Sequence, residues 1–111
     1  EGFYKQSTDG GTNWSVPKRL TWNSGWSSIT AIAVDSNNHI HLICYDDTPG
    51  NYEIFYKQSI EGGANWTLTR VTWNSGPSYS PSMVIDSNNH IHVAWWDKTP
   101  GNYEIFYKKK D

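Results

Sequence analysis

A repeated sequence unit constrains the fold of this chain more than any other feature. The segment FYKQS at Phe3–Ser7 recurs at Phe55–Ser59, 52 positions later, and the segment DSNNHIH that begins at Asp35 recurs at Asp86, 51 positions later. Internal repeats of this length indicate an architecture built from similar stacked units. We therefore expect a single domain over residues 1–111, with repeat 1 at about 1–52, repeat 2 at about 53–103 and an extra strand at 104–108.

Each repeat has the pattern of four β-strands. Apolar and polar residues alternate over several short segments, and the 7 Trp, 7 Tyr and 3 Phe also favour strands. Asn-rich and Pro-Gly turns separate these segments. Over one repeat length the expected strands are 28–35, 39–46, 52–59 and 66–73. Four antiparallel strands in about fifty residues are typical of a propeller blade. The predicted fold class is all-β, with four-stranded antiparallel meanders that form about two β-propeller blades per chain.

Two octapeptides carry a family resemblance. Ser7–Trp14 reads S-x-D-x-G-x-x-W, and Ser59–Trp66 keeps the same frame with Glu61 where the motif has Asp. This motif resembles the Asp box, or BNR repeat, of the sialidase-like β-propellers. The resemblance covers both repeats. It implies that each box occupies the turn between the third and fourth strands of a blade, on the face away from the family's active site.

The residue types in the box predict a structural role. A carboxylate at Asp9 can accept backbone N–H groups within the turn, Gly11 can adopt a conformation that a Cβ would oppose, and Trp14 can pack beneath the blade. A Glu at position 61 fits the same role with looser geometry. The expected structural set is Ser7, Asp9, Gly11, Trp14, Ser59, Glu61, Gly63 and Trp66.

The arginine content argues against catalysis. Sialidases, as the resemblance implies, hold the substrate carboxylate with three arginines and use a Tyr/Glu nucleophile pair and an Asp acid. This chain has two arginines, Arg19 and Arg70, at the same place in successive repeats, so they cannot converge within one chain. The F/Y-R-I-P arginine motif is also absent. We predict that the chain is not an enzyme and has no catalytic residues; the remote alternative is a fragment of a sialidase-like glycoside hydrolase separated from its catalytic blades.

A histidine pair offers a second candidate chemistry. His39 and His41 lie two apart on one predicted strand and therefore share a face, and His90 and His92 repeat the pattern. Asp35 across the hairpin is a possible third ligand. Packing or hydrogen bonding between neighbouring blades is the favoured interpretation, so we predict no metal and no cofactor.

The single cysteine and two glycosylation-like motifs are given structural interpretations. Cys44 aligns with Trp95 of the second repeat, so we expect a buried core thiol and not a nucleophile. The sequons at Asn13 and Asn65 lie inside the Asp-box turns, and we interpret them as coincidental.

Two sets of loops form the candidate ligand surface. In a propeller, the loops between strands two and three emerge on the same face as the loops between blades. Tryptophan beside Asn, Asp and Ser suits carbohydrates, because the ring stacks on C–H groups while polar groups bind hydroxyls. The alternative is that these tryptophans plug the space between blades. The candidate ligand residues are Trp22, Asn23, Trp26, Asp47, Tyr52, Trp73, Asn74 and Tyr103.

Charge and hydropathy exclude two classes of partner. The net charge is −2, and the longest run among the 9 Lys and Arg is the three residues Lys108–Lys110, so we expect no basic stripe that suits nucleic acid or an anionic membrane. No apolar stretch approaches the ~20 residues that cross a bilayer. We expect an extracellular or secreted location, although the lone cysteine leaves the redox compartment open. The start at Glu1 suggests a processed or excerpted piece.

The repeat is out of phase with the ends of the chain, and this predicts assembly. Propellers close with four to eight blades, whereas two blades leave two apolar faces uncovered. The N-terminus supplies a third and fourth strand at about 2–7 and 14–22, and the C-terminus supplies a first, second and third. Head-to-tail pairing of copies would complete the broken blade. We expect a homo-oligomer, with a six-bladed trimer favoured over an eight-bladed tetramer. The N-terminal copy of the third strand should be used, which leaves 109–111 frayed.

Overall fold

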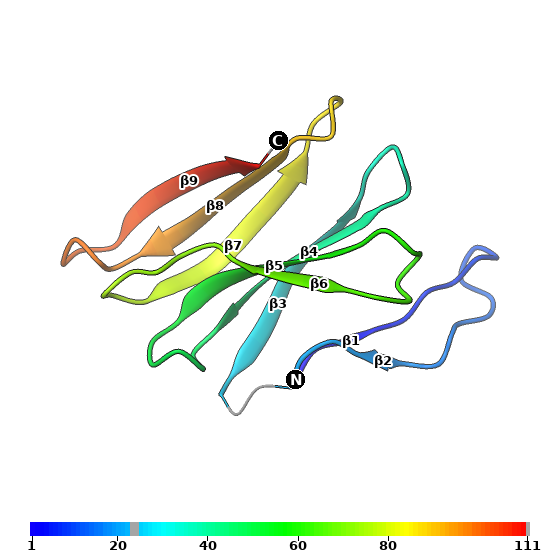
Figure 1. Ribbon diagram of the computed structural model, residues 1–111, viewed down its shortest axis with the longest axis horizontal. Helices are drawn as coiled ribbons and strands as arrows, with labels where there is room; N and C mark the ends of the chain where they lie inside the picture. Colours follow the sequence, from blue (N-terminus) through cyan, green and yellow to red (C-terminus); the bar gives the residue numbers. More distant parts are fainter. Residues whose placement is uncertain (23–24, 111) are drawn as a thin grey trace.

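A computed structural model describes residues 1–22 and 25–110, which form β-strands and turns with no helix among them (Figure 1). The strands of this part fall into three antiparallel sheets, in the orders β1-β2, β3-β4-β5-β6 and β7-β8-β9. The strands are β1 (Phe3–Tyr4), β2 (Lys18–Arg19), β3 (Ser27–Val34), β4 (Ile40–Asp46), β5 (Glu53–Ser59), β6 (Thr67–Arg70), β7 (Ser78–Ile85), β8 (Ile91–Asp97) and β9 (Glu104–Lys110). The all-β prediction is confirmed.

The central sheet is a four-stranded meander in which each strand pairs with the next in the chain. Its first three strands begin and end within one residue of the predicted bounds, while β6 is shorter than the predicted 66–73. Asn38 closes the first turn with a φ of 62°, a left-handed conformation that Asn tolerates better than most residues. The alternation and turn signals therefore located this sheet correctly.

The three sheets share two apolar clusters, one on each face of the central sheet. Consecutive residues of a strand point to opposite faces, so Leu42 and Ile43 of β4 belong to different clusters. On one face β7 contacts β3, β4 and β5, and this cluster contains Ile43, Ile54, Tyr56, Met83, Ile91, Val93 and Trp95. The opposite face is covered by the N-terminal hairpin, and this smaller cluster contains Leu20, Leu42 and Cys44, with Tyr4, Ile29, Phe55 and Trp66 packed against it.

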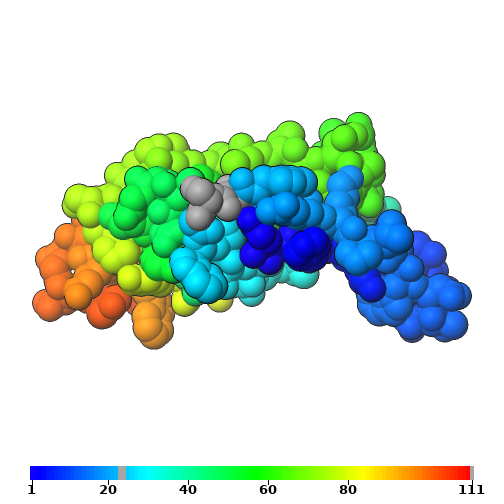
Figure 2. Space-filling view, turned by 90° about the horizontal axis from the view of Figure 1, so that it is seen from below, coloured from blue at the N-terminus to red at the C-terminus, as the bar shows by residue number. Residues whose placement is uncertain are grey.

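Two apolar surfaces stay uncovered in the single chain. Ile32 and Val34 of β3 are 53% and 59% exposed, although Met83 and Ile85, at the same positions of β7, pack in the core. Val84 of β7 is 64% exposed on the far side of the C-terminal sheet. The segment between β1 and β2 projects from the body of the molecule (Figure 2). Each end of the stack therefore carries an apolar surface with no sheet against it.

The two chain ends differ from the expectations. The N-terminal strands were predicted over 2–7 and 14–22, but β1 and β2 each contain two residues, because no further strand of the described residues pairs with β1. In the single chain Lys109 and Lys110 pair with His92 and Ile91, whereas the frayed C-terminus was expected of the assembled ring and stays a prediction. In the single chain this edge of β8 has only β9 to pair with. Asp111 lies outside the described residues.

Leu42 is buried and Val84 is exposed, so shortening each side chain to Ala should lower the stability of the fold by unequal amounts. Replacing Leu42, which is 2% exposed, by Ala should lower the free energy of unfolding by about 2–5 kcal/mol, because it leaves a cavity between the central sheet and the hairpin. Val84→Ala on the exposed face should change it by less than about 0.5 kcal/mol in the single chain. Urea unfolding followed by circular dichroism measures both, and equal effects would contradict the assignment.

Candidate functional site

The first Asp-box turn is held by side-chain hydrogen bonds. The Asp9 carboxylate accepts the backbone N–H of Asn13 at 2.9 Å and the Ser7 hydroxyl at 2.9 Å, while Ser7 Oγ accepts the N–H of Gly11 at 2.8 Å. Trp14 Nε1 donates to the Gly11 carbonyl at 3.1 Å. Hydrogen bonds from Asn13 and Ser7 lower the pKa of Asp9 to about 2. Gly11 has a φ of 95°, which a side chain would strain.

The second box repeats this pattern with a longer carboxylate. Ser59 Oγ accepts the N–H of Gly63 at 2.9 Å, and Trp66 Nε1 donates to the Gly63 carbonyl at 3.1 Å. The Glu61 carboxylate accepts the side-chain amide of Asn65. The sequon residues Asn13 and Asn65 thus both donate to the box carboxylate. All eight predicted box residues meet in these two turns.

A hydrogen-bonded chain of Asp, His and Tyr crosses three strands of the central sheet. His41 Nε2 lies 2.8 Å from Asp35 Oδ2, and His41 Nδ1 lies 2.6 Å from the Tyr56 hydroxyl. Asp35 also accepts the backbone N–H groups of Asn37 and His39. The same chain recurs in the second repeat as Asp86, His92 and Tyr107, with distances of 2.9 and 2.7 Å. The chain ties together the ends of β3, β4 and β5.

The environment of this chain suits a structural role. Burial raises the pKa of Tyr56 to about 12, the opposite of an activated phenolate. Burial also raises the pKa of Asp35, but hydrogen bonds from His41, His39 and Asn37 outweigh it and leave the pKa below the usual value. Among residues 1–22 and 25–110, no group of three or more His, Cys, Asp or Glu is arranged to hold a metal ion.

A tryptophan flanked by two cations occurs in each repeat. Trp22 lies 5.7 Å from the Arg19 guanidinium and 5.8 Å from Lys57 Nζ. Trp73 lies 5.5 Å from Arg70 and 5.9 Å from Lys108. Such cation–π contacts contribute about 0.5–1 kcal/mol at exposed sites. Trp22 and Trp73 are 68% and 66% exposed, so neither is buried between sheets.

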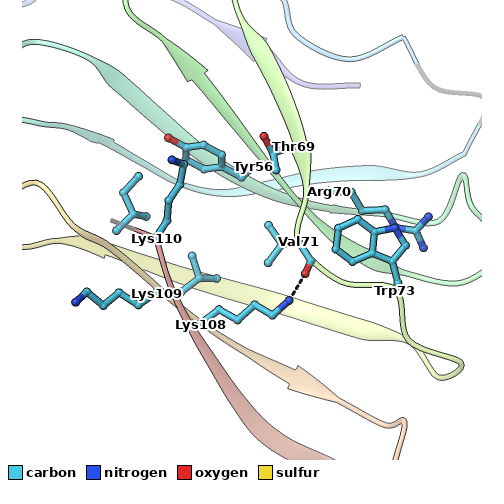
Figure 3. A pocket seen from close by; sticks show the side chains of 10 residues that line it. Tyr56, Thr69, Arg70, Val71, Trp73, Lys108, Lys109 and Lys110 are labelled. Carbon is cyan, nitrogen blue, oxygen red and sulfur yellow. Dashed lines mark hydrogen bonds between the residues drawn. The ribbon is translucent and has the colours of Figure 1, made fainter.

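The same lysines link consecutive sheets through the backbone. Lys57 of β5 donates to the Leu20 carbonyl, which follows β2, and Lys108 of β9 donates to the Val71 carbonyl at 2.7 Å (Figure 3). Leu20 and Val71 occupy the same position in successive repeats. One interface thus occurs twice along the chain.

The remaining candidate ligand residues are engaged within the protein. Asp47 accepts the N–H of Trp26 at 2.6 Å, and the Asn74 amide donates to Asp97, which is 1% exposed. Tyr52 and Tyr103 both lie beside the Tyr79 ring, with centroids 5.2 and 6.3 Å away. The Trp26 side chain is 77% exposed. Asn23 lies outside the described residues. The seven described candidates do not converge on one site.

One described pocket adjoins Trp22. It has a volume of about 330 Å³ and its lining includes Trp22, Phe55, Asp46 and Thr48. Cys44 also lines it, at the position where the second repeat has Trp95 stacked against Phe106, with centroids 6.1 Å apart. Cys44 is buried as expected, and burial raises the pKa of its thiol to about 11.

A buried carboxylate was missed by the sequence analysis. Glu53 is fully buried, and it accepts the Thr72 hydroxyl and the backbone N–H of Asn74. Arg70 Nη2 lies 3.8 Å from its Oε1. Glu1, Thr21 and Arg19 repeat the arrangement at the N-terminus. The signal was the Glu that begins each copy of the third strand, together with Arg and Thr two positions apart in both repeats.

Comparisons with protein-family models, curated proteins and solved structures give no match. In the part of the chain that the structure covers, no helix is long and apolar enough to span a membrane.

The Asp35 network predicts a pH-dependent stability. Because the folded pKa of Asp35 lies below the usual 3.8, its carboxylate stabilises the fold fully above about pH 4, and this stabilisation is lost as the pH falls further. Asp35→Asn should lower the free energy of unfolding at pH 7 by about 1–3 kcal/mol, because it disrupts the buried partner of His41. It should also flatten the loss of stability below pH 4.

Asp86→Asn is the matched control for this substitution. The Asp86 side chain is 35% exposed, against 5% for Asp35, so its replacement should cost less. Thermal melting at several pH values, followed by circular dichroism, measures both variants. An equal loss in the two variants, or an unchanged pH profile in Asp35→Asn, would contradict the role of the buried network.

Proposed function

We propose that this chain is a non-catalytic β-propeller module that closes into a ring by homo-oligomerisation. The central sheet is one whole blade. The hairpin β1-β2 supplies the third and fourth strands of another blade, and β7, β8 and β9 supply the first three. A head-to-tail neighbour then completes each broken blade. Three chains give six blades, as the sialidase resemblance implies, and four chains giving eight are the second choice.

The observation that carries this proposal is that the interface between sheets is already present twice in one chain. Lys57 and Leu20 join the hairpin to the central sheet as Lys108 and Val71 join the central sheet to the next. Against the central sheet the hairpin supplies only the third and fourth strands of a blade, β1 and β2. In the described residues no first or second strand pairs with this hairpin. A neighbouring copy has these strands, β7 and β8, at its C-terminal end.

The inner contacts can also be repeated between copies. Asn89 at the turn between β7 and β8 bonds Ser36 of the preceding sheet, with Asn89 Nδ2 2.7 Å from Ser36 Oγ. Asn38 and Ser87 occupy the corresponding positions of the two repeats. In the ring, Asn38 of one copy bonds Ser87 of its neighbour. The neighbour also covers Ile32 and Val34, as the central sheet covers Met83 and Ile85.

The N-terminal copy of the third strand fits the closing blade better than the C-terminal copy. Gly2 stands where the other copies have Ile54 and Ile105. A Cβ on Gly2 would lie 2.3 Å from Cδ1 of Ile29. If β9 took this place, the Ile29 side chain would have to rotate away from Ile105. The N-terminal copy therefore displaces β9 from β8 when the ring closes.

Assembly can be measured directly. Light scattering on the purified chain should give a mass three times 12.7 kDa, or four times for the second choice. Ile32→Asp should abolish assembly, because it places a charge on an apolar face that becomes buried. Val16→Asp is the control, because Leu68, at the same place in the complete central sheet, stays 59% exposed. A wild-type chain that stays monomeric at micromolar concentration would exclude the proposal.

Carbohydrate binding is a second candidate, favoured by the pocket beside Trp22. It combines aromatic rings at Trp22 and Phe55 with the polar groups of Asp46 and Thr48, the mixture that suits a sugar. The matching place in the second repeat is occupied by Trp95, so the site occurs once in each chain.

Filling the pocket tests this candidate. Cys44→Trp should abolish any sugar-dependent change in tryptophan fluorescence, because Trp95 shows that the fold accommodates this residue there. Cys44→Ser leaves the pocket open and should bind as the wild type does. A panel of neutral and acidic oligosaccharides is the probe, and the absence of any response by the wild-type chain would exclude carbohydrate binding at this site.

A further inference from the structure

The two Asp-box tryptophans make the same local hydrogen bonds but have different surroundings. Trp66 meets the Tyr4 ring edge-on, with centroids 5.6 Å apart and planes at 72°, and packs against the cluster of Leu20 and Leu42. It thereby joins the central sheet to the hairpin. Trp14 is 58% exposed and lies in the turn that projects from the body of the molecule (Figure 2). The glycines follow the same pattern, with Gly63 buried and Gly11 exposed.

The chain carries an open pocket at the place that corresponds to the position of Trp66. This pocket has a volume of about 330 Å³ and lies between β6 and the C-terminal sheet (Figure 3). Its lining includes Tyr56, Val71 and Val93. In the repeat, these residues correspond to Tyr4, Leu20 and Leu42, the three that surround Trp66. Strands β7, β8 and β9 match the first three strands of the central sheet, and among the described residues no fourth strand pairs with β9.

We propose that Trp14 of a second copy of this chain occupies this pocket, against Tyr56, Val71 and Val93. The proposal rests on the assembly proposed above and names the side chain by which one copy recognises the next. It holds whichever copy of the third strand pairs with β8, because Trp14 precedes β2, the fourth strand.

The polar groups around the pocket already have the arrangement found beside Trp66. Lys108 donates to the Val71 carbonyl as Lys57 donates to the Leu20 carbonyl. Arg70 lies over Trp73 as Arg19 lies over Trp22. When β1 of the second copy displaces β9, Lys5 takes the place of Lys108, because both occupy the position of Lys57 in the repeat. A buried aromatic anchor in an apolar pocket is the commonest kind of interface hot spot.

The first test compares two exposed tryptophans in the full chain. Trp14→Ala should raise the dissociation constant for assembly at least about 30-fold, the effect of a typical hot spot. Trp26→Ala removes a tryptophan that is 77% exposed and lies outside the pocket, and it should change the constant by less than about 3-fold. Sedimentation equilibrium measures both, and circular dichroism checks that the variants fold.

The outcomes separate the two proposals. A wild-type chain that does not assemble overturns the proposed function and the role of Trp14 together. A wild-type chain that assembles, with Trp14→Ala and Trp26→Ala equally unaffected, leaves the assembly standing and overturns only the role of Trp14.

A second measurement locates the contact even if a variant folds poorly. A photoreactive benzoylphenylalanine replaces Trp14 in one preparation, which is mixed with an isotopically labelled wild-type chain and irradiated. Cross-links from position 14 to labelled peptides that contain Tyr56, Val71 or Val93 are expected. Cross-links only within one copy, or to labelled peptides elsewhere, would overturn the proposal.

Discussion

The structure depends on a central sheet that is apolar on both faces. Leu42 and Ile43 are neighbours on β4, point in opposite directions and are both almost fully buried. A sheet of this kind is stable only with a layer on either side, and the hydrophobic effect supplies the main driving force for that stacking. The C-terminal sheet covers one face with residues of the long strands β7 and β8, whereas the hairpin covers the other with two short strands. The unequal cover of the two faces is the physical reason for the proposed assembly.

Polar networks help to fix the register of the strands in the central sheet. Asp35, His41 and Tyr56 connect successive strands near one end of the central sheet, while Glu53 and Thr72 connect β5 to the segment after β6 at the other end. In the described part of the chain, no buried side-chain nitrogen or oxygen lacks a hydrogen-bond partner. A buried carboxylate such as Glu53 is costly unless it is fully paired, so these networks penalise a shifted strand more strongly than apolar contacts alone do.

The strands whose bounds depend on local sequence patterns were predicted well from the sequence. Alternation and turn residues located β3, β4 and β5 closely, because each of these strands pairs with a strand next to it in the sequence. The same patterns overestimated β1 and β2, whose length depends on strands that the chain does not place beside them. The pairing of Lys109 and Lys110 with β8 was missed for a related reason, because a free strand edge accepts residues of little β-propensity. The roles of Glu53 and Asn74 depend on contacts across twenty residues, which spacing alone does not reveal.

The differences between the repeats matter more for function than their similarity. If the repeats were identical, every interface between sheets would be equivalent, and copies could join in several frames. Gly2 in place of Ile54 suits the hairpin to Ile29. Among the described residues no strand pairs with the outer edge of β9, and the pocket beside Tyr56 is open. Trp14 is exposed, and its counterpart in the repeat, Trp66, fills the corresponding site beside Tyr4. In the proposed assembly the pocket and the tryptophan come from opposite ends of two copies, so their contact is head to tail, and such contacts form a ring where the rotation between copies closes.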